Sequence, residues 1–187
     1  MEGAAAVTQE DCFAKLWSIK VPSKIAIFAW RLIRDRLPTR HKLQRRQVQV
    51  ADTSCPLCRV EEENAGHLFF HCSKIQPLWW EAMSWINLKG AAPLTPKMNF
   101  NQHMGLQVDG VRSNRWQCWW LALTWSIWKT RNSIVFSNAS FDANKVFEDA
   151  IFILWTWLRN YEKGFTEHFN YWSSNIRQSF CTTRGLL

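Results

Sequence analysis

The sequence contains neither a long apolar run nor a secretory leader. No run approaches the roughly 18 consecutive apolar residues that a transmembrane helix needs, so we predict no membrane span. Residues 1–11 lack the basic and apolar regions of a signal peptide, which predicts that the protein is not secreted. We therefore expect a nuclear or cytoplasmic protein with no membrane partner.

Acidic residues are fewer than basic ones. The chain has 15 Asp and Glu against 23 Lys and Arg, which gives a formal net charge of +8. A basic excess favours an anionic partner, and nucleic acid is the commonest, although many basic proteins are simply soluble.

Several enzyme signatures are also missing. A zinc deaminase needs a His-x-Glu pair before its Pro-Cys-x-x-Cys pair, and none precedes Cys55. The run His67 to His71 lacks the Glu of a His-Glu-x-x-His metalloprotease, and no Gly-rich phosphate loop occurs. We therefore predict that the protein is not an enzyme, with no catalytic residues and no small-molecule substrate.

One group of Cys and His residues has metal-ligand spacing. Cys55 and Cys58 form a C-x2-C pair, His67 follows, and Cys72 lies after a His-x4-Cys step. A C-x2-C turn points two thiolates at one ion, and a slightly opened helical turn brings the second pair to it. Such a closed set predicts one structural Zn²⁺ ion, because no position is left open for catalytic water.

His71 offers an alternative fourth ligand. It lies four residues after His67, on the same face of a helix, and so competes with Cys72. We favour Cys72, since thiolate is the stronger zinc donor. Glu61, Glu62 and Glu63 lie between the two ligand pairs, and we predict that they form a solvated first turn of the helix that leads to His67.

Apolar residues recur at helical spacing through most of the chain, which predicts a mainly α fold. We expect a small helical zinc-binding domain, a zinc knuckle plus helices, followed by a Trp-rich helical pair. Thr39 and Asp142 are predicted helix N-caps, Ser133 to Phe136 a short extended piece, and Lys129 and Arg131 the basic C-terminal end of a helix. The predicted division is a flexible leader (1–11), the zinc-binding domain (12–86), a linker (87–111), the Trp-rich helical region (112–164) and an unassigned tail (165–187).

Basic residues concentrate just before the zinc ligands. They could line phosphates from paired helices, although the same residues could simply solvate those helices. We interpret them as the nucleic-acid-binding residues, for RNA or single-stranded DNA: Arg31, Arg34, Arg36, Arg40, Lys42, Arg45 and Arg46.

The 13 Trp allow a second interpretation. Trp-rich helices could present an apolar surface to a protein partner, with zinc purely structural. For most of these Trp we favour packing against each other in the core.

Residues 12–86 resemble the zinc-binding domain that follows the reverse transcriptase in plant non-LTR retrotransposons. The matching words include Val21-Pro22-Ser23-Lys24, Phe28-Ala29-Trp30-Arg31 and Cys55-Pro56-Leu57-Cys58, then His67-Leu68 and Cys72. The resemblance implies a retrotransposon-derived, nucleic-acid-binding accessory domain, and it supports Cys72 over His71 as the ligand.

A second block, Trp125 to Asn132 and then Phe136, resembles the segment that links this domain to a ribonuclease H domain. No paired-Asp motif for catalytic magnesium occurs. We therefore expect a stand-alone fragment without the polymerase or ribonuclease H domains.

Overall fold

In a computed structural model of the chain, the structure describes residues 9–181. Every regular element within that range is helical, so the prediction of a mainly α fold is confirmed. None of the described helices is long and apolar enough to cross a bilayer. In chain order the elements are α1 (Gln9–Ser18), α2 (Ser23–Ile33), α3 (Arg40–Arg45), the π-helical turn η1 (His67–His71), α4 (Gln76–Trp85), α5 (Pro96–Gly105), α6 (Ser113–Ser137), α7 (Ala143–Tyr161), α8 (Phe169–Ser174) and α9 (Ile176–Phe180).

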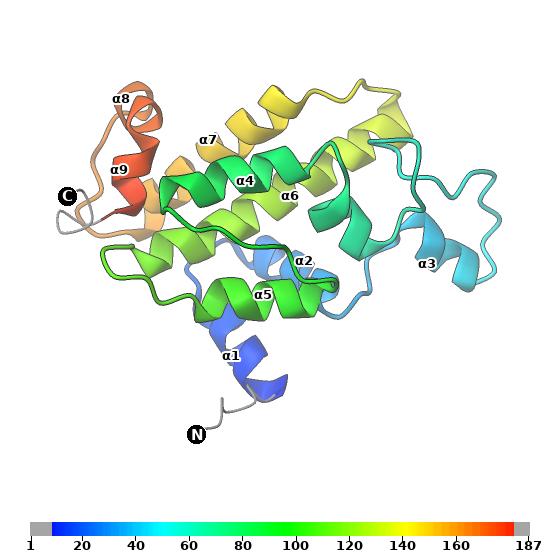
Figure 1. Cartoon of the computed structure of the whole chain (residues 1–187), viewed down its shortest axis with the longest axis horizontal. Coiled ribbons are helices and arrows are strands. Elements are labelled where there is room, and N and C mark those ends of the chain that lie inside the picture. Colours follow the sequence, from blue (N-terminus) through cyan, green and yellow to red (C-terminus); the bar gives the residue numbers. More distant parts are fainter. Residues whose placement is uncertain (1–8, 182–187) are drawn as a thin grey trace.

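The long helix α6 is the centre of the fold. It packs against α7 over much of its length and also contacts α2, α5 and α9 (Figure 1). α6 has no Gly or Pro along its 25 residues, and it ends at Asn138, which takes the left-handed conformation that suits a helix C-cap. α7 begins at its predicted cap, because the Asp142 side chain accepts a hydrogen bond from the Lys145 backbone N–H at 3.1 Å.

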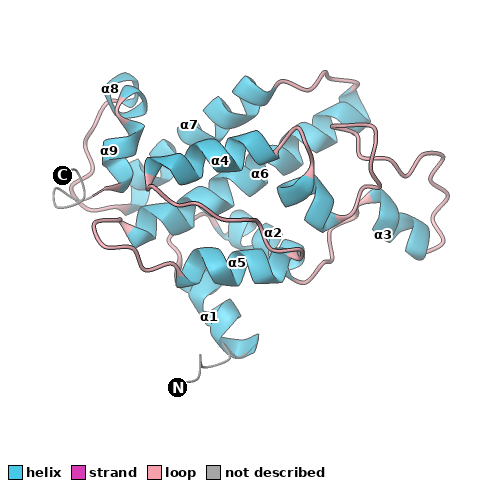
Figure 2. Cartoon of the chain, viewed as in Figure 1, coloured by secondary structure: helices cyan, strands magenta, loops and turns pink. Residues whose placement is uncertain are grey.

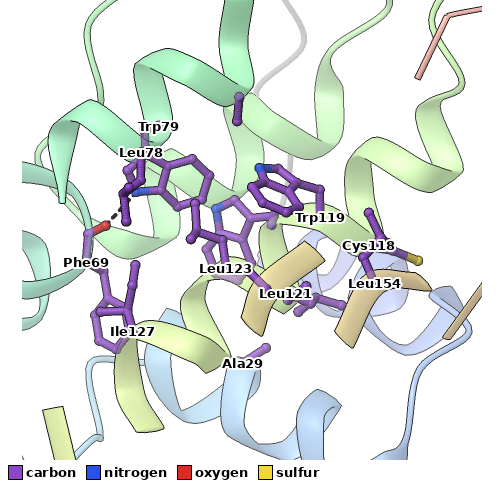
Figure 3. Close-up of a cluster of buried hydrophobic side chains, with 14 of the residues drawn as sticks. Ala29, Phe69, Leu78, Trp79, Cys118, Trp119, Leu121, Leu123, Ile127 and Leu154 are labelled. Carbon is purple, nitrogen blue, oxygen red and sulfur yellow. Dashed lines mark hydrogen bonds between the residues drawn. The ribbon is translucent and has the colours of Figure 1, made fainter. Parts of the chain in front are cut away.

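Large aromatic side chains fill the core around α6. Trp116, Trp119 and Trp120 are buried, and Trp85 stacks on Phe180 with ring centroids 5.2 Å apart. A buried Trp usually finds a hydrogen-bond acceptor for its indole N–H, although those of Trp116 and Trp119 have none among the described residues. Figure 3 shows one solution, in which the Trp79 indole donates to the Phe69 carbonyl at 2.7 Å. The Trp-rich helices therefore pack against each other, as we favoured from the sequence.

Two predictions about secondary structure were wrong. Residues 133–136 are not extended, because α6 continues to Ser137 and Ile134 packs against the core. The predicted linker 87–111 contains α5, which Thr95 caps by accepting a hydrogen bond from the Met98 N–H. The tail had no assigned structure, and its described part holds α8 and α9. Of the predicted leader, residues 9–11 belong to α1, and residues 1–8 lie outside the described residues.

The segment that follows α2 contains little helix, unlike the region around α6. Between α3 and η1 the chain runs through loops and turns, at the opposite end of the molecule from α8 and α9 (Figures 1 and 2). α3 itself begins as predicted, with Thr39 Oγ1 accepting from the Lys42 N–H, but it buries none of its residues. This loop-rich end, from α3 to η1, contains the predicted metal ligands, and we call it the ligand-bearing end.

Candidate metal centre

The first two ligands, Cys55 and Cys58, lie on a small loop that backbone hydrogen bonds close. We call residues 53–63 the ligand loop. The Cys55 N–H donates to the Glu61 carbonyl at 2.6 Å, and the Glu63 N–H donates to the Thr53 carbonyl at 2.8 Å. Arg59 turns the chain with a φ of 58° and donates its own N–H back to the Cys55 carbonyl. The loop therefore curls back on itself, as the C-x2-C spacing predicts.

The second pair of ligands lies at the two ends of η1. The Cys72 N–H donates to the His67 carbonyl at 2.7 Å, which closes an i to i+5 turn. This is the opened helical turn that the His-x4-Cys spacing requires. Leu68, Phe69 and Phe70 are buried between the ligands and anchor the turn, since the Phe69 ring stacks on Trp128 of α6 at 6.2 Å.

The four ligand atoms meet at one place. The Sγ atoms of Cys55, Cys58 and Cys72 and a ring nitrogen of His67 all lie within 4.8 Å of one another. The Cys55 and Cys72 Sγ atoms are 4.0 Å apart, and Cys58 Sγ is 3.3 Å from His67 Nε2. A tetrahedral zinc site with Zn–S bonds of about 2.3 Å places its sulfur atoms roughly 3.8 Å apart, so the set fits this ion.

Hydrogen bonds between the Cys and His side chains of the cluster shift one another's pKa values. Hydrogen bonding to Cys72, with burial adding to it, raises the pKa of the Cys55 thiol to about 12. The same hydrogen bond lowers the pKa of Cys72, and contact with the Cys55 thiol raises the pKa of His67. Zinc binding requires thiolates and a neutral imidazole, so binding releases these protons and becomes stronger as pH rises.

Comparison with known families agrees with this geometry. Residues 4–79 match the family model described as zinc-binding in reverse transcriptase. This matched segment contains all four clustered residues. No curated protein and no solved structure matches the chain. The match and the Cys3His cluster together support a zinc-binding module.

The alternative ligand His71 does not join the cluster. Its Nε2 atom lies 3.1 Å from the Pro93 carbonyl oxygen, so it contacts the loop before α5 instead. The second sequence resemblance, over residues 125–136, lies outside the matched segment and stays a prediction.

Glu63 has a role that the sequence did not indicate. We predicted a solvated carboxylate, but Glu63 is fully buried and accepts two hydrogen bonds from Arg131, at 2.6 and 2.9 Å. Its Oε2 also accepts the Arg40 backbone N–H at 2.7 Å. Arg131 is buried as well and lies well before the end of α6, so the prediction that it marks a helix C-terminus was wrong. This ion pair joins the ligand loop to the central helix. Its partners are 68 positions apart in the sequence, so no local pattern indicates the pair.

The predicted nucleic-acid-binding residues divide into two groups. Two are engaged with carboxylates: Arg40 contacts Asp52 at 2.9 Å and the Ser54 carbonyl at 2.7 Å, and Lys42 pairs with Asp35. Arg40 thus braces the ligand loop. The other five are exposed and form no ion pair with residues 12–181: Arg31, Arg34, Arg36, Arg45 and Arg46.

Proposed function

We propose that this protein is a non-catalytic, zinc-dependent module that binds RNA or single-stranded DNA and derives from a plant non-LTR retrotransposon. The family match supports the zinc-binding part, and the sequence resemblance of residues 12–86 supports the origin. Cys55, Cys58, His67 and Cys72 would hold one Zn²⁺ ion. With four protein ligands the ion supplies a crosslink and no open coordination position, which is the arrangement of a structural site.

The observation that supports nucleic-acid binding is that the five exposed arginines form no ion pair with residues 12–181, so their charges are available to phosphates. Arg34 and Arg36 are held over the ring of Trp30, with guanidinium carbons 5.5 and 5.8 Å from the ring centroid. A cation–π contact orients a guanidinium without neutralising its charge. Arg45 and Arg46 are exposed at the end of α3, the helix whose first residue, Arg40, contacts the ligand loop. Such groups suit phosphates, which arginine contacts in bidentate geometry.

A salt titration tests this proposal. We would measure the affinity for a fluorescently labelled eight-nucleotide oligouridylate by anisotropy at several salt concentrations. Each phosphate contact contributes roughly 0.7 to the slope of log K against log salt for single strands. The double variant Arg45→Gln/Arg46→Gln should therefore weaken binding and reduce the slope by about 1.4.

The control removes equal charge elsewhere. Lys129 and Lys163 are exposed and lie outside the predicted group. The double variant Lys129→Gln/Lys163→Gln should leave the slope nearly unchanged. Equal effects of the two double variants, or binding without salt dependence, would contradict a site at these arginines.

The alternative function, protein interaction through the Trp-rich helices, has less support. The Trp residues of α6 that face the core are unavailable to a partner, because Trp116, Trp119, Trp120 and Trp128 are buried. Trp17 and Trp80 are the exposed Trp of the described chain, and neither lies on α6 or α7.

A further inference from the structure

A cavity of about 410 Å³ lies between α4, α5 and the start of α6, and Phe70 and His71 of η1 line part of it. Its size is in the range of small-ligand sites. Six of the 16 residues that line it carry aromatic rings: Phe70, His71, Trp79, Trp80, His103 and Trp116.

Two of these rings form a fixed wall. His103 stacks on Trp116 with centroids 4.5 Å apart and planes 12° apart, and its Nε2 lies 2.8 Å from the Trp116 carbonyl oxygen. Burial lowers the pKa of His103 to about 4, so its ring is neutral at pH 7. The wall therefore presents uncharged π-surface.

Trp80 differs from the other rings. It is 58% exposed, although it lines the cavity, and it stacks on no other aromatic ring of the described residues. Exposing a large ring costs free energy that burial would recover. Trp80 is thus a flat apolar surface at the cavity that lacks a stacking partner.

Besides the two imidazoles, the polar side chains of the cavity are three amides and one cation. The Gln76 and Gln102 carboxamides form no hydrogen bond with residues 12–181, and Asn99 uses its oxygen to accept from Trp120 at 2.8 Å, which leaves its NH2 group. Lys89 is exposed and has no ion-pair partner in the same range. Among the residues that the structure describes, no carboxylate lines the cavity.

We propose that this cavity receives one unstacked nucleobase of a single strand, with Trp80 stacking on the base, the carboxamides facing its polar edge and Lys89 meeting the adjacent phosphate. Aromatic side chains bind splayed bases in this way, and amides pair with base edges. The inference rests on the proposed function, because it assigns a base-binding site to a protein whose arginines contact phosphate.

The amides favour a base over an apolar peptide side chain. An aliphatic or aromatic side chain would desolvate the Gln76, Asn99 and Gln102 amides without pairing them, which costs free energy. A nucleobase offers donors and acceptors at its edge, and its phosphate complements Lys89.

The test compares two Trp of similar exposure. Trp80→Ala removes the ring at the cavity, and Trp17→Ala removes a ring that is 54% exposed on α1 and does not line it. Stacking on one aromatic ring strengthens binding by a factor on the order of 5 to 100. Trp80→Ala should therefore weaken oligouridylate binding by that factor with an unchanged salt slope, because Trp carries no charge, whereas Trp17→Ala should bind like the original protein. Both variants replace exposed side chains, and thermal melting should confirm that each is folded.

A second measurement separates the cavity from the arginines. In a ¹⁵N-edited NMR titration, uridine monophosphate should shift the indole N–H signals of Trp79, Trp80 and Trp116. The variant Lys89→Gln should weaken binding of uridine monophosphate more than binding of uridine, which has no phosphate. Oligonucleotide binding that Trp80→Ala leaves intact, with no indole shifts, would overturn the cavity assignment and leave the proposed function standing. Indole shifts without salt-dependent oligonucleotide binding would overturn the proposed function and retain the cavity.

Discussion

The two ends of this protein are held together by different forces. Around α6 and α7, buried Trp, Phe and Leu side chains form a continuous apolar core, in which the hydrophobic effect is the main stabilising term. At the ligand-bearing end, α3 buries no residue and the chain runs mostly through loops. That end shares in the apolar core through Leu57 and the buried residues of η1, and it adds a small number of directional contacts: the cluster of Cys and His side chains and the Glu63–Arg131 pair.

The two ends should therefore respond differently to the loss of a single contact. An apolar core spreads its stabilisation over many contacts, so one loss is partly tolerated. A loop held by a few polar links depends on each of them, because a buried charge without its partner costs several kcal/mol. We therefore expect local unfolding at the ligand-bearing end under conditions that leave α6 and α7 folded.

Metal removal should have the largest effect. Structural zinc contributes about 10 kcal/mol or more of apparent binding free energy to folding. A strong chelator, or the substitution Cys72→Ser, should abolish amide protection over residues 53–72 in hydrogen-exchange mass spectrometry, while residues 116–134 stay protected. Cys181→Ser is the control, because Cys181 lies outside the cluster. Loss of protection in both regions together would show that the two ends do not unfold separately.

Breaking the buried ion pair should come next. Glu63→Gln leaves the Arg131 guanidinium buried without a counterion, which should lower the free energy of unfolding by about 3–5 kcal/mol. A matched pair exists at the other end of α6, where buried Arg115 contacts Glu162 at 3.0 Å.

Glu162→Gln should cost less, because its carboxylate is 32% exposed and water screens the remaining charge. Urea denaturation of both variants makes the comparison. Equal midpoints would contradict the view that Glu63 is a principal link between the ligand loop and α6.

A steric change at η1 should have the smallest effect. A Cβ atom added at Gly66 would lie 2.5 Å from the Leu94 carbonyl oxygen, whereas one at Gly90 would meet nothing within 4 Å. Gly66→Ala should therefore destabilise the protein by about 1–3 kcal/mol, because backbone must move to make room. Gly90→Ala should change the thermal midpoint little, and a similar shift for both would show that the close approach is unimportant.

The sequence was most informative where the physics is local. Metal-ligand spacing indicated the four side chains that the fold brings together, and helical periodicity located α2, α6 and α7, because both patterns depend on neighbours a few residues apart. The caps Thr39 and Asp142 were predictable for the same reason.

The remaining features depend on contacts between distant segments. The partner of Glu63 lies 68 residues away, so a run of three glutamates gave no sign that one of them is buried. The β-branched Ile134 and Val135 favoured an extended segment locally, but the segment is helical and Ile134 packs against the core. α5 was missed because its buried positions include the polar Asn99, although Thr95-Pro96 is a readable start signal for a helix.

The Glu63–Arg131 pair also bears on how the protein should be cut for experiments. The segment that matches the family model stops at residue 79, but the guanidinium that neutralises Glu63 comes from Arg131. A fragment bounded by the family match would carry an uncompensated carboxylate beside its ligand loop and expose the phenylalanines that α6 covers. Expression boundaries that run past Asn138 keep both the counterion and its helix.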